Sequence, residues 1–181
     1  HTLAGEATEG YESCRLALKA RFNANRAIST SGTTEAINLV AHAWGRANLS
    51  DGDAIILTEM EHHSDIVPWQ MLAQEMNIEL RYVPVQKDLT LDMDLFEAAI
   101  DGAKLVCVVH ISNVLGVCNP VEKIVEIAKQ NGAKVLLDAA QSAPHQDIDF
   151  VALGADFMAF SAHKMCGPTG IGALLVSDEA F

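Results

Sequence analysis

The sequence is poor in basic residues and aromatic residues, and it contains no long hydrophobic run. Lysine and arginine total 12 against 24 aspartates and glutamates, which gives a formal net charge of -12. A chain this acidic repels nucleic acid phosphates and the head groups of anionic membranes. No apolar run approaches the roughly 20 residues that a membrane-spanning helix needs, and from the first residues we expect no signal peptide. We therefore expect no nucleic acid and no membrane among its partners.

Cysteine is also scarce, and its four copies are scattered without a CxxC pair. In a chain that is 50% hydrophobic, scattered cysteines indicate reduced thiols in a cytoplasmic protein rather than a disulfide framework. The seven histidines lack metal-ligand spacing. The adjacent His62 and His63 would point in opposite directions on an extended segment, so they would chelate one ion poorly. The sequence predicts a cytoplasmic protein without a bound metal.

Short apolar runs alternate with helical patterns along all 181 residues. This alternation predicts an α/β fold, with a mostly parallel seven-stranded sheet covered by helices on both faces. The run LVCVV at 105–109 is apolar throughout, as expected of a strand buried on both sides. The predicted strands are 27–30, 54–57, 79–83, 105–110, 134–137, 157–160 and 172–176. The predicted helices are 8–22, 34–44, 66–76, 95–100, 121–130 and 149–153.

Polar or ionisable side chains follow five of these predicted strands. In open α/β sheets, ligands bind beyond the carboxyl ends of the strands, so five such ends together are consistent with one site. In chain order the groups are Thr33 and Thr34, then Glu61, His62 and His63, then His110 and Asn113, then Asp138 and Gln141, and finally Ser161, His163 and Lys164.

Lys164 lies between the apolar strand FMAF and a Gly-Pro-Thr-Gly loop. A lone lysine is most often a solvated charge. Near the mouth of a sheet, however, a lysine can be partly desolvated, lose its proton and act as a nucleophile toward an aldehyde. Pyridoxal 5'-phosphate (PLP) requires such a residue, because the resting cofactor is an imine to a lysine. We interpret Lys164 as the residue that carries PLP.

Residues at the other strand ends suit the remaining needs of this cofactor, although each has a structural alternative. Asp138 can keep the pyridine nitrogen protonated, or it can cap a helix. The turn SGTT at 31–34 offers hydroxyls and free N–H groups to a phosphate, or it can be an ordinary helix cap. His62 can stack on the ring, and Gln141 or Asn113 can donate a hydrogen bond to the phenolic oxygen.

Five stretches of the chain match one known family in order and spacing. The chain resembles the PLP-dependent cysteine desulfurases of fold type I, in the class V aminotransferase superfamily. It is most similar to the group II branch, which includes the Suf-type desulfurase and the selenocysteine lyases. The resemblance covers essentially the whole chain. The stretches are SGTTEAINLVAHAWG (31–45), EMEHHSDIVPWQ (59–70), HISNVLG (110–116), DAAQSAPH (138–145) and FSAHKMCGPTGIG (160–172).

The resemblance implies a role for each candidate residue. It makes Lys164 the PLP lysine, and Asp138 the partner of the pyridinium nitrogen. Gln141 corresponds to the donor to the phenolic oxygen, and His62 to the stacking histidine, which we also expect to be catalytic together with Lys164. Thr33, Thr34, Ser161 and His163 correspond to the phosphate cradle, and Asn113 lies beside cofactor and substrate.

The resemblance also implies an activity. A cysteine desulfurase removes sulfur from L-cysteine, giving alanine and an enzyme persulfide. The sulfur then passes to an acceptor protein for iron–sulfur cluster assembly. Family members are homodimers. The alternatives are a selenocysteine lyase, another PLP enzyme of the superfamily, and a folded fragment without turnover.

The chain departs from the family pattern in two respects. Ala162 stands where the family usually has glycine before the His-Lys pair. In addition, the sulfur-accepting cysteine and the substrate-carboxylate arginine of the family lie well after the lysine, beyond Phe181. Residues 1–181 are therefore predicted to be an incomplete PLP-binding large domain, without an N-terminal segment and the C-terminal small domain. Cys166 is not expected to substitute, so we expect no cysteine desulfuration by this chain alone.

Overall fold

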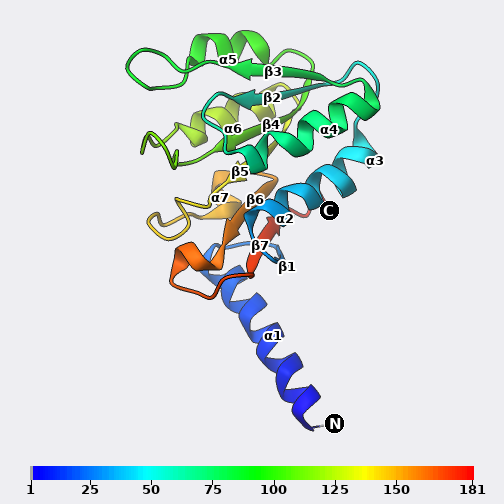
Figure 1. Cartoon of the computed structure of the whole chain (residues 1–181), viewed down its shortest axis with the longest axis vertical. Coiled ribbons are helices and arrows are strands. Elements are labelled where there is room, and N and C mark those ends of the chain that lie inside the picture. The colour runs from blue at the N-terminus through cyan, green and yellow to red at the C-terminus, as the bar shows by residue number, and fades with distance from the viewer. Residues whose placement is uncertain (1) are drawn as a thin grey trace.

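A single seven-stranded sheet forms the centre of the computed structural model, which describes residues 2–181 (Figure 1). The strand order is β1-β7-β6-β5-β4-β2-β3. Only β7 runs antiparallel to its neighbours, so the other six strands end at the same edge. The strands are β1 (Arg26–Thr30), β2 (Ala54–Thr58), β3 (Glu79–Val83), β4 (Ala103–Val109), β5 (Lys134–Asp138), β6 (Phe157–Ser161) and β7 (Gly172–Val176).

Helices cover both faces of this sheet, which confirms the predicted fold class. On one face, Ile124 of α6 and Phe150 of α7 pack with the strands in one buried core. On the other face, Ile37 of α2 and Trp69 of α4 belong to a second core. The helices are α1 (Thr2–Arg21), α2 (Thr33–Leu39), α3 (Arg46–Asn48), α4 (Val67–Met76), α5 (Met93–Ala99), α6 (Val121–Gln130) and α7 (Phe150–Leu153).

Two helices differ from their predicted extent. The helix predicted over 34–44 is α2 followed by a π-helical turn, Val40–Gly45, and then α3. Helix α1 begins at Thr2, six residues before the predicted start at Thr8. It has no buried residue and extends away from the sheet (Figure 1), so no hydrophobic pattern marks its beginning. Among residues 2–181, no helix has both the length and the apolar character needed to cross a membrane.

Candidate active site

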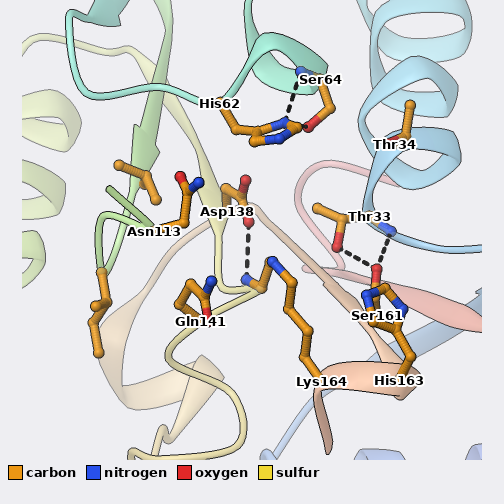
Figure 2. Close-up of a pocket in the computed structure, with 13 residues that line it drawn as sticks. Thr33, Thr34, His62, Ser64, Asn113, Asp138, Gln141, Ser161, His163 and Lys164 are labelled. Carbon is orange, nitrogen blue, oxygen red and sulfur yellow. Dashed lines mark hydrogen bonds between the residues drawn. The ribbon is translucent and has the colours of Figure 1, made fainter. Parts of the chain in front are cut away.

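A cavity of about 210 Å³ lies at the edge where the parallel strands end. All nine predicted site residues line it, although they come from five separate segments of the chain (Figure 2). Ser64, Val109, Ile111 and Ala140 complete the lining. His110 does not take part, because it lines a different cavity beside Cys118 and Glu122. The nine residues are Thr33, Thr34, His62, Asn113, Asp138, Gln141, Ser161, His163 and Lys164.

Lys164 lies in a short 3₁₀ turn, Ala162–Met165, directly after β6. Figure 2 shows its side chain reaching into the cavity toward Asp138. The extra methyl group of Ala162 is accommodated by Gly167, where a Cβ atom would lie only 2.9 Å from that of Ala162. The N–H of Gly167 also donates to the carbonyl of Ala162 at 2.8 Å. The departure from the family pattern therefore leaves the turn that presents Lys164 intact.

Asp138 is the last residue of β5 and is only 3% exposed. Its Oδ1 accepts a hydrogen bond from the N–H of Ala140 at 2.8 Å. Burial raises the pKa of Asp138, while that hydrogen bond and the positive charges of Lys164 and His62 act in the opposite direction. Residues 139–149 contain no helix, so capping does not explain the position of this carboxyl group.

The start of α2 and the end of β6 are joined at the other side of the cavity. Ser161 Oγ accepts a hydrogen bond from the N–H of Thr33 at 2.8 Å and lies 2.7 Å from Thr33 Oγ1. Gly32 occupies the cap position of α2 without a side-chain cap hydrogen bond, so ordinary capping by this turn is the wrong interpretation. The close approach depends on Gly172, because a Cβ there would lie 2.5 Å from Gly32 Cα.

His62 lies above Asp138 in the close-up, between the other two groups of site residues (Figure 2). Its Nδ1 accepts from the N–H of Ser64 at 3.1 Å and lies 2.8 Å from Ser64 Oγ. The rings of His62 and His63 stand at 90° to each other with centroids 6.3 Å apart, so they do not converge. Within residues 2–181, no three His, Cys, Asp or Glu side chains gather in a way that could hold a metal ion.

Sequence reasoning missed two residues near this site, Ser64 and Asp65. Ser64 fixes the His62 ring, and Asp65 is fully buried, with its Oδ1 accepting from the indole N–H of Trp69 at 2.9 Å. The signal was present, because Asp65 and Trp69 are four residues apart and such residues meet at helical spacing. The indole N–H of Trp69 therefore takes the place of water as the hydrogen-bond donor to the buried Asp65.

The chemistry of the lining is that of a site for a ring with distinct ends. One end offers an amine, Lys164, and a buried carboxyl group, Asp138, while the opposite end offers the hydroxyls of Thr33 and Ser161. An imidazole lies over the space between them. Such a set can bind a protonated heterocycle through the carboxylate, an aldehyde through the amine, and a phosphate through the hydroxyls.

The whole chain, residues 1–181, matches the Aminotransferase class-V family, and the chain belongs to that family. Among curated relatives, a probable cysteine desulfurase from Halalkalibacterium halodurans is 52% identical over 178 residues, which cover 96% of this chain and 44% of the relative. A cysteine desulfurase from Enterobacter sp. is 48% identical over 183 residues, which cover 99% of this chain and 45% of the relative. The chain thus spans less than half the length of these relatives.

Solved structures show the same fold. The apo cysteine desulfurase of Thermococcus onnurineus NA1 superposes with a TM-score of 0.94 at 43% identity, covering 100% of this chain and 46% of that chain. The cysteine desulfurase CsdA of Escherichia coli superposes with a TM-score of 0.92 at 36% identity, covering 98% of this chain and 45% of that chain. These similarities agree with the family resemblance of the five sequence stretches.

Proposed function

We propose that this chain is the PLP-binding part of a cysteine desulfurase. The observation that carries the proposal is that Lys164 and the buried Asp138 lie in one cavity. The same cavity holds hydroxyl groups that can hydrogen-bond a phosphate, and a histidine that can cover the cofactor ring. Two curated relatives that are 52% and 48% identical carry the name cysteine desulfurase. A C-DES variant with glycine covalently linked to the PLP cofactor has the same fold, with a TM-score of 0.84 at 27% identity.

The residues present fit PLP because each functional group of the cofactor has a matching partner. PLP, when bound, supplies an electron sink that stabilises negative charge at a substrate carbon. Asp138 would hold the pyridine nitrogen in its protonated form. Burial raises the pKa of Asp138 despite the Ala140 N–H and the charges of Lys164 and His62, so a cationic ring nitrogen would add a partner for a carboxylate that the chain compensates only in part.

The remaining site residues position the ring. Ser161, His163, Thr33 and Thr34 would hold the phosphate. Gln141 would donate to the phenolic oxygen, and Asn113 would lie beside substrate and cofactor. Lys164 would hold the cofactor covalently and, once the substrate amine replaces it, move a proton at the substrate carbons. His62 would cover the ring, and because its Nδ1 is bonded to Ser64, its Nε2 is the atom that can exchange a proton.

The sulfur acceptor is proposed to lie in the part of the relatives that this chain does not span. No cysteine within residues 2–181 lines the site cavity. Burial raises the pKa of the Cys107 thiol well above its usual range and also raises that of Cys118, so neither is an activated nucleophile. We propose the same for the arginine that grips the substrate carboxylate. Residues 1–181 would then be an incomplete large domain, without the N-terminal segment and the C-terminal small domain.

The proposed setting follows from this assignment. The substrate would be L-cysteine or selenocysteine, and the products from L-cysteine would be alanine and an enzyme persulfide. The sulfur would pass to an acceptor protein for iron–sulfur cluster assembly in the cytoplasm, and the enzyme would be a homodimer. A carbon–sulfur lyase is the second candidate, because the cystine C-S lyase C-DES, bound to cysteine persulfide, has a TM-score of 0.84 at 28% identity. Sulfur that remains bound to the protein favours the desulfurase, and sulfur released as free persulfide favours the lyase.

An absorbance spectrum after addition of PLP tests the cofactor assignment. We expect an imine band near the edge of the visible range in the wild type, and we expect Lys164→Ala to lose it. Lys87→Ala is the matched control, because Lys87 is exposed and lies outside the cavity. Identical spectra for the wild type and Lys164→Ala would refute the assignment.

A further inference from the structure

Two carboxyl groups are buried next to the His62 segment, outside the cavity lining. Glu61 is 7% exposed and Asp65 is fully buried. They stand one residue before and three residues after His62, on the segment that joins β2 to α4. Neither residue is used by the proposed cofactor chemistry, so their burial needs a separate explanation.

Half of the oxygen atoms in this pair have donors. Glu61 Oε1 accepts from Thr58 Oγ1 at 2.6 Å and from the N–H of Val109 at 2.9 Å. Asp65 Oδ1 accepts from the indole N–H of Trp69 at 2.9 Å. The other two oxygens, Glu61 Oε2 and Asp65 Oδ2, are buried and have no donor within residues 2–181. The two carboxyl groups lie within hydrogen-bond reach of each other.

Two ionised carboxylates cannot satisfy each other, because both are acceptors. A single proton between them converts one into a donor and satisfies both orphaned oxygens. Glu61 already accepts two hydrogen bonds and Asp65 only one, so Glu61 is the natural carboxylate and Asp65 the natural acid. Burial raises the pKa of Glu61 to about 7 and that of Asp65 well above its usual range.

We propose that Glu61 and Asp65 share one proton and act as a positioning pair, which ties the His62 segment to the ends of β2 and β4. The bonds to Thr58 and Val109 attach this segment to the two strands. The titratable groups that face the pair are Asp138 on β5 and Cys107 on β4. The role of His62 over the ring rests on the proposed function, but the shared proton does not.

Amide substitutions test the sharing directly. In Asp65→Asn, the amide N–H replaces the shared proton and the charge stays on Glu61. In Glu61→Gln, the amide donates to Asp65 instead. In the double variant, the N–H groups of Val109 and Trp69 donate to the side-chain carbonyl oxygens at positions 61 and 65. The two side-chain NH₂ groups then face each other, and neither has an acceptor. We expect each single variant to keep its Tm within about 3 °C of the wild type, and the double variant to lose more than about 6 °C.

The opposite order of Tm values, with the double variant highest, would contradict the proposal. If both carboxyl groups were ionised, each substitution would remove a buried repulsion, and the double variant would be the most stable of the four proteins. Infrared difference spectra at neutral pH give an independent readout. We expect the carbonyl stretch of a protonated carboxylic acid in the wild type, and its loss in both single variants. A band that survives in either single variant would show that the proton is not shared.

The pH dependence of Tm separates the shared proton from simple packing. Because folding raises the pKa of the pair, the stability that it contributes is present at low pH and is lost as the pH rises through the folded pKa. The Tm of the wild type should therefore fall relative to Asp65→Asn as the pH rises from about 3.8, the ordinary pKa of an aspartate, through the raised pKa of Asp65. Parallel curves over this range would contradict the proposal.

Cofactor affinity reports the position of His62. The Kd for PLP should stay within about twofold in each single variant and rise about tenfold in the double variant, as expected when one buried hydrogen bond is lost. An unchanged Kd in the double variant would contradict the positioning role. The Lys164→Ala spectrum tests the proposed function separately, and the infrared and Tm measurements do not depend on PLP. A failure of the proposed function can therefore be distinguished from a failure of the shared-proton proposal.

Discussion

At the residue scale, the site depends on side chains that are buried before any ligand arrives. Asp138 is 3% exposed and has one backbone donor. Ser161 is 5% exposed and is held by two contacts with Thr33. Groups that are already desolvated and fixed need little reorganisation when a charged ligand binds, which favours tight and specific binding. Each can be tested by a substitution of nearly equal size.

Asp138→Asn should stabilise the chain without PLP and weaken the binding of PLP. Folding raises the pKa of Asp138 through burial, so the free energy of unfolding falls as the pH rises from about 3.8 through the folded pKa. The asparagine variant lacks this loss. At pH 7 it should be more stable than the wild type, and near pH 3.5 the difference in the free energy of unfolding should vanish.

Urea unfolding at the two pH values measures this effect. The Kd for PLP should rise at least about tenfold in the same variant, because the ring nitrogen loses its ionic partner. A variant that is less stable than the wild type at pH 7 would show that the carboxylate is already compensated within the chain.

Ser161→Ala should loosen the junction between β6 and α2. The substitution leaves the buried N–H of Thr33 without its acceptor, which costs about 1–3 kcal/mol. Ser142→Ala is the control, because Ser142 is buried as well but its hydroxyl has no partner within residues 2–181. Thermal unfolding should show a clear loss for Ser161→Ala and little change for Ser142→Ala. Equal losses would mean that the bond to Thr33 contributes nothing specific.

At the element scale, the fold places five loops at one edge because only β7 runs against the other strands. All seven predicted strands are present, since buried strands are short apolar runs that the sequence shows directly. Helix α1 has no buried face to mark its start, and the π-helical turn at Val40–Gly45 leaves no mark in the apolar pattern. The pairing of Glu61 with Asp65 was not predictable either, because it depends on Thr58, Val109 and Trp69, which meet only after folding.

Gly172→Ala should separate two elements that pack backbone to backbone. A Cβ at this position would lie 2.5 Å from Gly32 Cα and 2.6 Å from the carbonyl oxygen of Phe160. Overpacking of this kind costs about 1–3 kcal/mol. The control is Gly5→Ala in α1, where nothing lies within 4 Å of the added Cβ, and where alanine should stabilise the helix by up to about 1 kcal/mol.

Thermal unfolding and PLP titration of the two glycine variants check this prediction. The Gly172 variant should lose both stability and affinity, because the start of α2 moves away from Ser161. Wild-type behaviour of both proteins would show that the turn can shift without consequence.

At the scale of the whole molecule, the nine site residues were identifiable from sequence because the ends of parallel strands meet at one edge and because five stretches match a known family. The strand ends alone also indicated Glu61, His63 and His110, which do not line the cavity. Their roles stay predictions. The net charge of -12 gives the 181-residue chain an overall negative field. The burial of Glu61 and Asp65 could not be predicted from sequence motifs, because acidic residues usually face solvent.

We expect the 181-residue chain alone to bind PLP without converting cysteine to alanine. The chain supplies the cavity residues, but no cysteine within residues 2–181 lines that cavity. An assay of alanine and protein-bound sulfur, run beside a full-length cysteine desulfurase such as that of Enterobacter sp., measures this. Alanine production together with protein-bound sulfur on the 181-residue chain would show that one of its own four cysteines accepts sulfur, and Cys166→Ser would then be the first variant to examine.

The central claim is that Lys164 holds PLP, and peptide mapping tests it most directly. The protein is incubated with PLP and reduced with borohydride, which converts the imine into a stable secondary amine. It is then digested, and its peptides are sequenced by tandem mass spectrometry. We predict one dominant pyridoxyl adduct, located on Lys164. Adducts spread evenly over exposed lysines such as Lys87, with none enriched at Lys164, would contradict the account.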